Sequence, residues 1–384
     1  MRTAPLGDIA DIVSGATPKT GVAEYWGGDV QWATPADLSK LEGAFISKTP
    51  RTLTDAGVRS CGTTILPVGS VLLSSRAPIG HVAINTVPMA TNQGFKSLVP
   101  RSDVDAKYLY HWLRSTTVYL QSLGNGATFK ELSKKTTEQI RVPLPTLSEQ
   151  RRIAAILDHA DALRAKRRQV LAHLDSLTVS IFHDMFGDPR SNRQGFPQAR
   201  IGSIARVMTG NSPSRADAAN FGDDIEWIKS DNLGEPVATR SEESLSEAGR
   251  SRARIAPAGS VLVTCIAGSP TSIGKASLVD RDVAFNQQIN AVLPSPDLDS
   301  LFLLGQFKNA PELVRAKSTG GMKGLVNKSA FESIEILVPP IEMQRAFASR
   351  VKKVSAQRGA VSTAIELDDE LLAALRARAF QGAL

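Results

Sequence analysis

The chain has 384 residues, which is too long for one ordinary domain. Its hydrophobic content of 42% is high enough for two domains with sizeable cores. Its net charge of +7 is compatible with a polyanionic partner, although many soluble proteins are mildly basic. No apolar run is long enough to span a bilayer and the N-terminus lacks a signal-peptide core, so we expect no membrane association and a cytoplasmic location.

The first 146 residues alternate short apolar segments with turns rich in Gly and Pro, a pattern typical of a mixed domain of the α+β class. Residues 39–62 interrupt this pattern because they are polar, and we predict an irregular segment there. The predicted helices cover residues 5–15 and 108–120, and the predicted strands cover residues 30–33, 81–84, 94–99 and 139–142. Residues 64–74 are predicted to form a strand, a Pro/Gly turn and a second strand.

Apolar residues then recur at seven-residue intervals from Ser148 to Asp184, which predicts a coiled-coil helix. Ser148 is available as its N-cap, and Gly187-Asp188-Pro189 marks its end. About 37 residues at roughly 1.5 Å per residue give a rod of about 55 Å, which needs a second helix to cover its apolar stripe. The predicted seam of this helix consists of Ile153, Ile156, Leu163, Val170, Leu174, Leu177 and Ile181.

The second half of the chain repeats the first. Leu6-Gly-Asp-Ile-Ala10 is matched by Ile201-Gly-Ser-Ile-Ala205, and the pair Asn92-Gln93 is matched by Asn286-Gln287. The last forty residues repeat the long helix, which makes the duplication one of a whole unit, a globular domain followed by a helix. The predicted seam of the second helix consists of Val354, Val361, Leu371 and Leu375.

We therefore predict an α+β fold with two similar mixed α/β domains separated by two long helices, which form an antiparallel coiled coil within a pseudo-twofold internal repeat. Arg167 falls at a seam position, where a polar residue can fix the helix register, and we predict that Asp368 pairs with it. The predicted boundaries are residues 1–146 for the first domain, 147–186 for the central helix, 187–198 for a linker, 199–340 for the second domain and 341–384 for the C-terminal helix.

The motifs that carry catalysis or bind metals are absent from the sequence. The segment Gly268–Ala276 resembles a phosphate-binding loop, but the spacing of its glycines is wrong and Ala276 replaces the Ser or Thr that would hold magnesium. The five histidines have no metal-ligand spacing, and we expect the two cysteines, Cys61 and Cys265, to be free. We predict neither catalytic residues nor a metal site.

Two similar domains on a helix pair suit a DNA duplex with two half-sites. Basic and amide side chains in the predicted loops could contact phosphates or base edges, although each one alone fits a solvated surface charge as well. The candidates are Lys19, Arg51, Arg59, Arg76, Lys130 and Lys134 in the first half, and Arg215, Lys229, Asn232, Arg252, Lys275, Lys323 and Lys328 in the second.

The chain resembles the specificity subunit of type I restriction-modification systems. The resemblance rests on Pro5-Leu-Gly-Asp-Ile9, on Ile79-Gly80, on Asn92-Gln93 and above all on Pro143-Leu-Pro-Thr-Leu-Ser-Glu-Gln-Arg-Arg-Ile-Ala-Ala155 leading into a coiled-coil helix, all of which are duplicated. It covers essentially the whole chain. The second copy departs from the first at Val338-Pro-Pro-Ile-Glu-Met-Gln-Arg345 and has a less regular seam.

The resemblance implies a non-catalytic subunit with two target-recognition domains, each of which reads one half of a split, asymmetric DNA site. It further implies that the helices set the gap between the half-sites and dock two modification subunits, which use S-adenosylmethionine to methylate adenine. Restriction and translocase subunits, which use ATP and Mg, would complete the complex.

Two alternatives remain open at this point. The chain could be a specificity module of another phage-defence or stand-alone methylation assembly, with the same fold and different partners. It could also be a coiled-coil scaffold that binds proteins without nucleic acid. The scaffold predicts no DNA binding, whereas phosphate contacts predict binding that weakens as the salt concentration rises.

Overall fold

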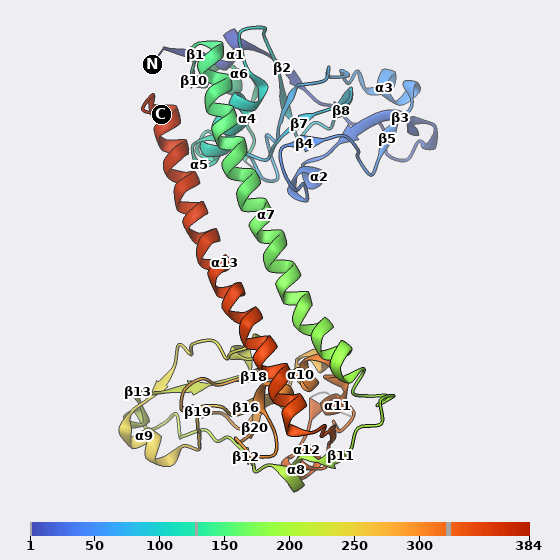
Figure 1. Cartoon of the computed structure of the whole chain (residues 1–384). Coiled ribbons are helices and arrows are strands. Elements are labelled where there is room, and N and C mark those ends of the chain that lie inside the picture. Colours follow the sequence, from blue (N-terminus) through green and yellow to red (C-terminus); the bar gives the residue numbers. More distant parts are fainter. Residues whose placement is uncertain (1, 127–129, 320–323) are drawn as a thin grey trace. The chain divides into compact units, whose positions relative to one another are not determined.

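The computed structural model describes residues 2–126, 130–319 and 324–384. Its contacts divide the chain into two compact units, unit 1 with Met1–Arg168 and Ala364–Leu384, and unit 2 with Gln169–Thr363. Helices α7 (Leu147–Phe186) and α13 (Ile341–Gln381) confirm the two long helices predicted from the heptads (Figure 1). Each unit thus combines a mixed α/β part with a portion of both long helices.

Unit 1 contains sheets with the strand orders β2-β9-β6-β7-β4, β5-β3-β8 and β1-β10. The strands pair antiparallel except in β4–β7 and β3–β8, which are parallel. The strands are β1 (Thr3–Pro5), β2 (Ala10–Ser14), β3 (Trp26–Ala33), β4 (Phe45–Ile46), β5 (Thr52–Leu53), β6 (Val71–Leu73), β7 (Val82–Asn85), β8 (Met89–Thr91), β9 (Lys96–Pro100) and β10 (Arg141–Pro143).

Two helices of unit 1, α3 and α4, begin at side chains that cap them. Asp105 accepts from the backbone N–H groups of Lys107 and Tyr108 at the start of α4, and Thr54 accepts from that of Gly57 at the start of α3. The short helices of this unit are α1 (Leu6–Ile9), η1 (Ala23–Tyr25), α2 (Pro35–Ser39), α3 (Asp55–Cys61), α4 (Ala106–Ser115), α5 (Thr117–Ser122) and α6 (Lys134–Gln139).

Two predictions for this region were wrong. The helix expected over residues 5–15 ends after one turn at Ile9, because residues 10–14 pair with β9 instead. The segment expected to be irregular over residues 39–62 contains α3. Helix α3 is held from outside its own sequence, since the Gly57 backbone lies close to the carbonyl of Tyr25 and the Thr54 hydroxyl donates to the carbonyl of Glu24.

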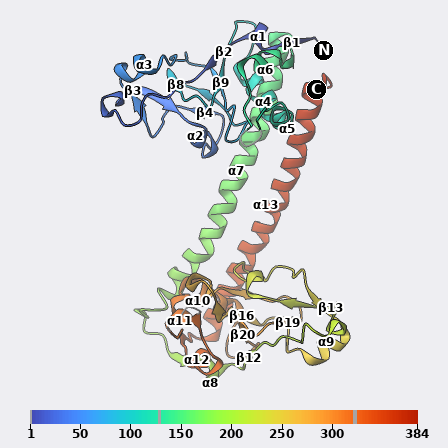
Figure 2. The same ribbon diagram turned by 180° about the vertical axis from the view of Figure 1, so that it is seen from behind.

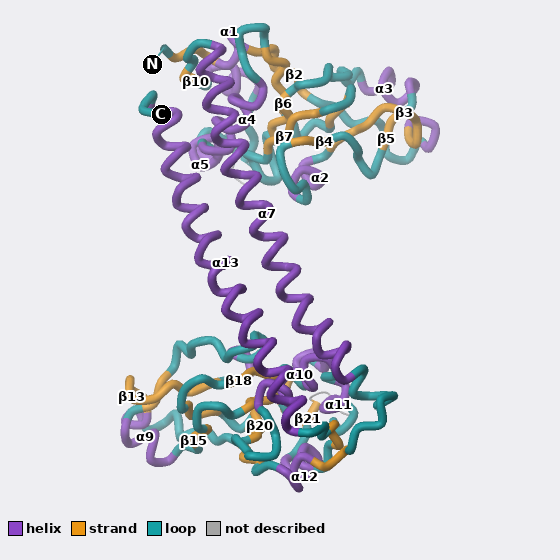
Figure 3. The backbone as a smooth tube through the Cα atoms, in the orientation of Figure 1, coloured by secondary structure: helices purple, strands orange, loops and turns teal. Residues whose placement is uncertain are grey.

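Unit 2 repeats this arrangement, with the strand orders β12-β20-β16-β18, β14-β13-β19-β15, β11-β22 and β17-β21. Figure 3 shows its strands and helices by colour. The strands are β11 (Gln198–Arg200), β12 (Val207–Thr209), β13 (Phe221–Ile228), β14 (Ser244–Leu245), β15 (Ile255–Ala256), β16 (Val261–Thr264), β17 (Ile266–Ala267), β18 (Ala276–Leu278), β19 (Val283–Phe285), β20 (Ile289–Val292), β21 (Gly324–Leu325) and β22 (Glu335–Leu337).

The parallel pair β13–β19 corresponds to the parallel pair β3–β8 of unit 1, so the duplication extends to strand direction. The chain therefore has an α+β fold built from two similar mixed α/β parts. The short helices of unit 2 are α8 (Ile201–Ile204), η2 (Ala218–Asn220), η3 (Ser230–Asn232), α9 (Glu247–Arg252), η4 (Pro270–Ser272), α10 (Ser300–Asn309), α11 (Glu312–Arg315) and α12 (Lys328–Glu332).

A buried glutamine attaches each long helix to its domain. In unit 1 the amide oxygen of Gln150 accepts from the backbone N–H of Asp105 at 2.9 Å, and its NH2 group donates to the Pro145 carbonyl at 3.0 Å. In unit 2, Gln344 makes the same bonds to Asp299 at 2.9 Å and to Pro339 at 2.8 Å. Both glutamines are fully buried. These bonds explain why a glutamine follows a proline at the start of each long helix, in Glu149-Gln150 and in Met343-Gln344.

The apolar core of each unit includes both long helices. In unit 1, Leu157 of α7 and Leu372 of α13 pack with residues of α4 in one cluster. Figures 1 and 2 show α4 beside α7. In unit 2, Phe182, Phe302 and Phe347 pack with their ring centroids 5.5–6.4 Å apart. Burying one such side chain stabilises the fold by about 1.5–3 kcal/mol. The long helices are therefore part of the globular cores and do more than connect them.

The seam of α7 differs from the predicted one at three positions, Leu163, Val170 and Leu177. Ile153 is buried and Leu174 and Ile181 are half-buried, as expected of seam residues, but Leu163, Val170 and Leu177 are 38–45% exposed. The less exposed positions lie one residue later, at Leu157, Arg164, Leu171, Thr178 and Met185.

A heptad divides its seam into steps of three and four residues, and the apolar pattern permits either order on α7. The structure adopts four then three, because Leu157 packs into the unit 1 core and Met185 against the unit 2 core. On α13, Val354, Val361 and Leu375 are half-buried, whereas Leu371 is 52% exposed and Leu372 takes its place. Ile156, also predicted, is half-buried.

Candidate nucleic-acid interface

In unit 1 a cluster of aromatic and basic side chains forms around Trp32, which is buried at the end of β3. The indole N–H of Trp32 donates to the carbonyl of Ala16 at 3.0 Å, and the ring of Trp26 meets it edge-on with centroids 5.0 Å apart. The guanidinium of Arg51 lies 3.5 Å from the centroid of Trp26. A stacked guanidinium keeps its N–H donors available in its own plane, which suits a phosphate or a base edge.

Unit 2 builds a similar cluster around Trp227. Its indole N–H donates to the carbonyl of Asn211 at 3.3 Å, and the cations of Arg215 and Lys229 lie 5.5 and 5.4 Å from its ring centroid. Glu243 pairs with both cations, with Arg215 at 2.9 Å. Its hydrogen bond from Lys229 holds the pKa of the Glu243 carboxylate below its usual value. Each cluster is thus centred on a tryptophan of its own, but the charged residues around the two tryptophans differ.

The loops that support the two tryptophans are held by equivalent hydrogen bonds. The backbone N–H of Ala16 donates to the Thr91 carbonyl at 2.9 Å, and that of Asn211 to the Phe285 carbonyl at 3.0 Å. Gly15 and Gly210 make this approach possible, because a Cβ on either one would lie 2.0–2.2 Å from a backbone oxygen. The sequence showed that these glycines recur but not that they bring the two loops together.

The other candidates of unit 1 lie in three places. Lys19 is exposed beside the tryptophans, and its carbonyl accepts from the indole of Trp26 at 3.4 Å. Arg59 is exposed on α3. Arg76 lies beside Gly94 and pairs with Glu131 at 3.7 Å, and Lys130 lines the same shallow pocket.

In unit 2 the remaining candidates are mostly occupied by contacts within the protein. Asn232 accepts from the backbone N–H of Lys229 at 3.0 Å and so closes a turn, which makes it a framework residue. Arg252 pairs with Asp217 at 2.9 Å. Lys275 is exposed and lines a cavity of about 560 Å³ together with Lys308, away from Trp227.

Lys134 and Lys328 occupy equivalent positions on α6 and α12. Each pairs with a glutamate one turn later on its own helix, Lys134 with Glu138 at 3.9 Å and Lys328 with Glu332 at 3.4 Å. These helices pack against α1 and α8, so the structure does not bring the two lysines to the tryptophan clusters. Lys323, another of the predicted candidates, lies outside the residues that the structure describes.

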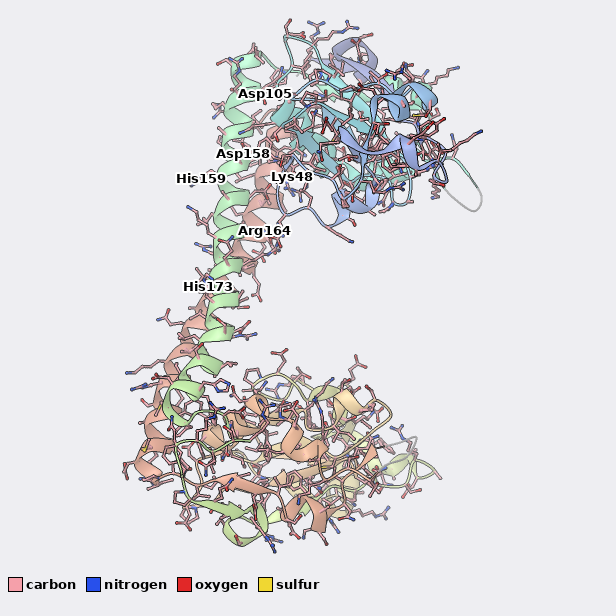
Figure 4. The ribbon with its side chains drawn as sticks, turned by 90° about the vertical axis from the view of Figure 1, so that its right-hand side faces the viewer. Lys48, Asp105, Asp158, His159, Arg164 and His173 are labelled. Atoms are coloured by element: carbon pink, nitrogen blue, oxygen red, sulfur yellow. The ribbon has the colours of Figure 1, made fainter. Side chains whose placement is uncertain are left out.

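Ion pairs connect the two long helices within each unit. In unit 1, Arg167 donates to Asp368 at 2.5 Å, which confirms the predicted pair, and Arg164 pairs with Asp369. In unit 2, Arg358 pairs with Asp175 at 2.7 Å. Arg358 and Asp369 stand 194 residues after Arg164 and Asp175, so the duplication repeats this ion pair as well. Figure 4 labels Arg164 on α7.

Cys61 and Cys265 are both free. Within residues 2–126, 130–319 and 324–384, no group of three or more His, Cys, Asp or Glu side chains could hold a metal ion. None of the described helices is long and apolar enough to cross a membrane.

The comparison with known proteins reflects the duplication of the chain. The family model of the type I restriction modification DNA specificity domain matches the chain twice, at residues 1–173 and 195–366. The MjaIX specificity subunit of a type I restriction enzyme from Methanocaldococcus jannaschii is 33% identical over 257 residues. The EcoR124I/EcoR124II specificity subunit from Escherichia coli is 27% identical over 165 residues.

These alignments cover 62% and 41% of this chain, and they span 60% and 40% of the archaeal and bacterial relatives, less than two thirds of either. Solved structures resemble the fold over nearly its full length. A chain from a structure on the assembly and conformational transition of the type I R-M system has a TM-score of 0.63 at 16% identity, covering 100% of this chain and 98% of that one.

The S subunit of a type I restriction-modification system from M. genitalium has a TM-score of 0.61 at 12% identity, covering 99% of this chain and 96% of that one. At such identities the structural likeness establishes the fold alone. The two matches of the family model together span most of the chain. The chain therefore belongs to the type I restriction modification DNA specificity family.

Proposed function

We propose that this chain is the DNA sequence-specificity subunit of a type I restriction-modification complex. Each unit would read one half of a bipartite, asymmetric site in double-stranded DNA. The observation that carries the proposal is the double match of the specificity-domain model to a chain whose two units carry equivalent tryptophan-centred clusters.

The clusters suit this task because both are built on a tryptophan held by an equivalent loop, while the charged residues around the two tryptophans differ. Arg51 stacks on an aromatic ring in unit 1, whereas Arg215 and Lys229 share Glu243 in unit 2. A carboxylate beside two cations can accept from a base amino group, which a cation alone cannot do. Two units with different donors and acceptors in the same frame would read different half-sites.

We further propose that the chain itself performs no chemistry. Two modification subunits, with S-adenosylmethionine, would methylate the adenines, and restriction and translocase subunits would use ATP and Mg. Exposed apolar residues of α7 offer the modification subunits a contact in each unit, Leu163 in unit 1 and Val170 with Leu177 in unit 2.

The test is co-expression of this chain with modification subunits in a host that lacks adenine methylation, followed by methylation mapping of the genome. The expected result is N6-methyladenine at one bipartite motif with a constant gap. Modification subunits expressed without this chain are the control and should leave the genome unmethylated. A motif without a gap, or no methylation in any combination, would contradict the proposal.

A further inference from the structure

Each unit carries an exposed glutamine on a rigid turn directly after the strand that pairs with the tryptophan strand. Gln93 follows β8 and Gln287 follows β19. The asparagine before each of them faces inward, where its side-chain oxygen accepts a backbone N–H, from Gly94 at 2.9 Å in unit 1 and from Gln288 at 3.1 Å in unit 2. The repeated Asn-Gln pair thus divides into a framework asparagine and an exposed glutamine.

A hydroxyl from the neighbouring loop orients each glutamine. The hydroxyl of Thr17 donates to the amide oxygen of Gln93, and the hydroxyl of Ser212 donates to that of Gln287. The loops that carry these hydroxyls are the ones held by Gly15 and Gly210 against the turn. The hydroxyl engages one lone pair of each amide oxygen and so orients the amide, whose NH2 group can only donate hydrogen bonds.

A fixed pair of donors on an exposed turn selects a ligand that accepts. Phosphate oxygens are acceptors only, and positive charge lies around both tryptophans. Arg51 supplies it at Trp32 in unit 1, and in unit 2 the two cations at Trp227, Arg215 and Lys229, outnumber the one carboxylate that pairs with them, Glu243. This excess of positive charge favours an anion. Base edges are a poorer match, because the two units carry the same hydroxyl-amide pair while their charged neighbours differ. A contact that both units make in the same way suits the DNA backbone, because its phosphates are the same in every half-site.

We propose that Gln93 and Gln287 each donate an amide N–H to a phosphate oxygen of DNA and thereby position their unit on its half-site. This inference rests on the proposed DNA-binding function. The differing side chains around Trp32 and Trp227 would then read the bases, from a register that the two glutamines set.

The test compares Gln93→Ala, Gln287→Ala and the double variant with the wild-type full chain. Matched controls are Gln139→Ala on α6 and Gln198→Ala on β11, both exposed glutamines on other elements of the same two units. The probes are a duplex with the mapped methylation target and a duplex of equal length with both half-sites scrambled, with binding measured by fluorescence anisotropy at several salt concentrations.

Each single variant should bind both duplexes about tenfold more weakly, the order of effect expected for one hydrogen bond to a charged group. The dependence of affinity on salt should stay as in the wild type, since a neutral amide releases no counterion. Methylation mapping with each variant should return the same motif, and both controls should bind as the wild type does.

Unchanged affinity of the double variant would overturn the inference while leaving the proposed function intact. So would a motif altered at one base pair, which would make the glutamine a base reader. A wild-type chain that binds neither duplex would instead overturn the proposed function. Thr17→Val and Ser212→Ala, which free the amides to rotate without removing them, should give a smaller loss, and they serve as the second set if the alanine variants misfold.

Discussion

His111 is a buried imidazole at the contact between α4 and α7, 1% exposed. Its Nε2–H donates to Asp158 at 2.8 Å, and Asp158 also accepts from Lys107 at 2.7 Å (Figure 4 labels Asp158). Burial lowers the pKa of His111 from its ordinary value of 6.5, and the hydrogen bond and charge of Asp158 only partly oppose this. The folded chain therefore binds a proton at His111 less readily than the unfolded chain does. Gly305 stands at the equivalent place in unit 2, so only unit 1 carries this group.

This burial predicts that unit 1 loses stability in mild acid. Below pH 6.5 the unfolded chain binds a proton at His111 that the folded chain excludes, so the free energy of unfolding falls as the pH drops from 7 towards 5. The slope contributed by one such group is at most about 1.4 kcal/mol per pH unit. Urea unfolding of His111→Gln, which cannot titrate, should show a shallower pH dependence over this range.

His159→Gln is the matched control for this measurement, because His159 is an exposed histidine on α7, next to Asp158. Its pH dependence should equal that of the wild type. An equally steep acid loss in His111→Gln would show that other groups cause it. The depressed pKa of Asp158 acts in a separate window, since the stability that this carboxylate contributes is lost only as the pH falls below about 4.

At the scale of single elements, α7 has more apolar side chains than the described fold buries. Leu157 is fully buried, whereas Leu163, six residues along the same helix, is 38% exposed. The ion pairs of Arg164 and Arg167 with α13 occupy seam positions where an apolar side chain would ordinarily lie. Asp368 is 8% exposed, so the charge of Arg167 is what makes its burial tolerable. Polar pairs in the seam and apolar residues outside it are the reverse of a simple coiled coil.

The two leucines give a paired prediction. Leu157→Ala should lower the free energy of unfolding by about 2–4 kcal/mol, because it leaves a cavity in the unit 1 core. Leu163→Ala removes the same atoms from a position that water already reaches, and should cost well under about 1 kcal/mol. Chemical denaturation followed by circular dichroism measures both. Equal losses would mean that Leu163 lies in the seam, as its heptad position had suggested. Pull-down with modification subunits should show the opposite order, with Leu163→Ala the weaker binder.

At the scale of the whole chain, unit 1 is assembled from both ends of the sequence. Its core contains Leu372 and Ala379 of α13, which are 3% and 0% exposed, and the ring of Phe380 lies 5.6 Å from that of Tyr108 on α4. Arg152 of α7 donates to the carbonyl of Leu384 at 2.7 Å. The first domain is thus incomplete without residues that lie more than 200 positions further along the chain.

Deletion of residues 372–384 should therefore destabilise unit 1 and spare unit 2. The deletion uncovers the face of α4 that carries Tyr108, at a cost of several kcal/mol for the buried side chains it removes. Hydrogen exchange should show faster exchange in α4, while α10 of unit 2 serves as the internal reference and stays protected. Equal acceleration in α10, or none in α4, would contradict the assignment of the C-terminal residues to unit 1.

The amino-acid sequence by itself determined the features that depend on neighbours along the chain. The seven-residue period and the flanking Pro and Gly residues predicted α7 and α13 closely, and the repeat at 194–195 residues predicted two similar halves. The opposite charges of Arg167 and Asp368 were enough to predict their pairing. The period of apolar residues, the residues at the ends of a helix and the sign of a charge can all be read from the sequence, without knowing which distant segments are in contact.

Tertiary structure decided what depends on contacts between distant segments. The choice between the two possible seams of α7 follows from where Leu157 and Met185 meet the cores, and α3 exists because Thr54 and Gly57 meet the backbone of residues 24–25. The hydroxyl of Thr17 orients a glutamine 76 residues away, and only folding brings the two together. Single-residue candidates such as Lys134 and Arg252 looked alike in the sequence, because a charge does not reveal whether the fold supplies its partner.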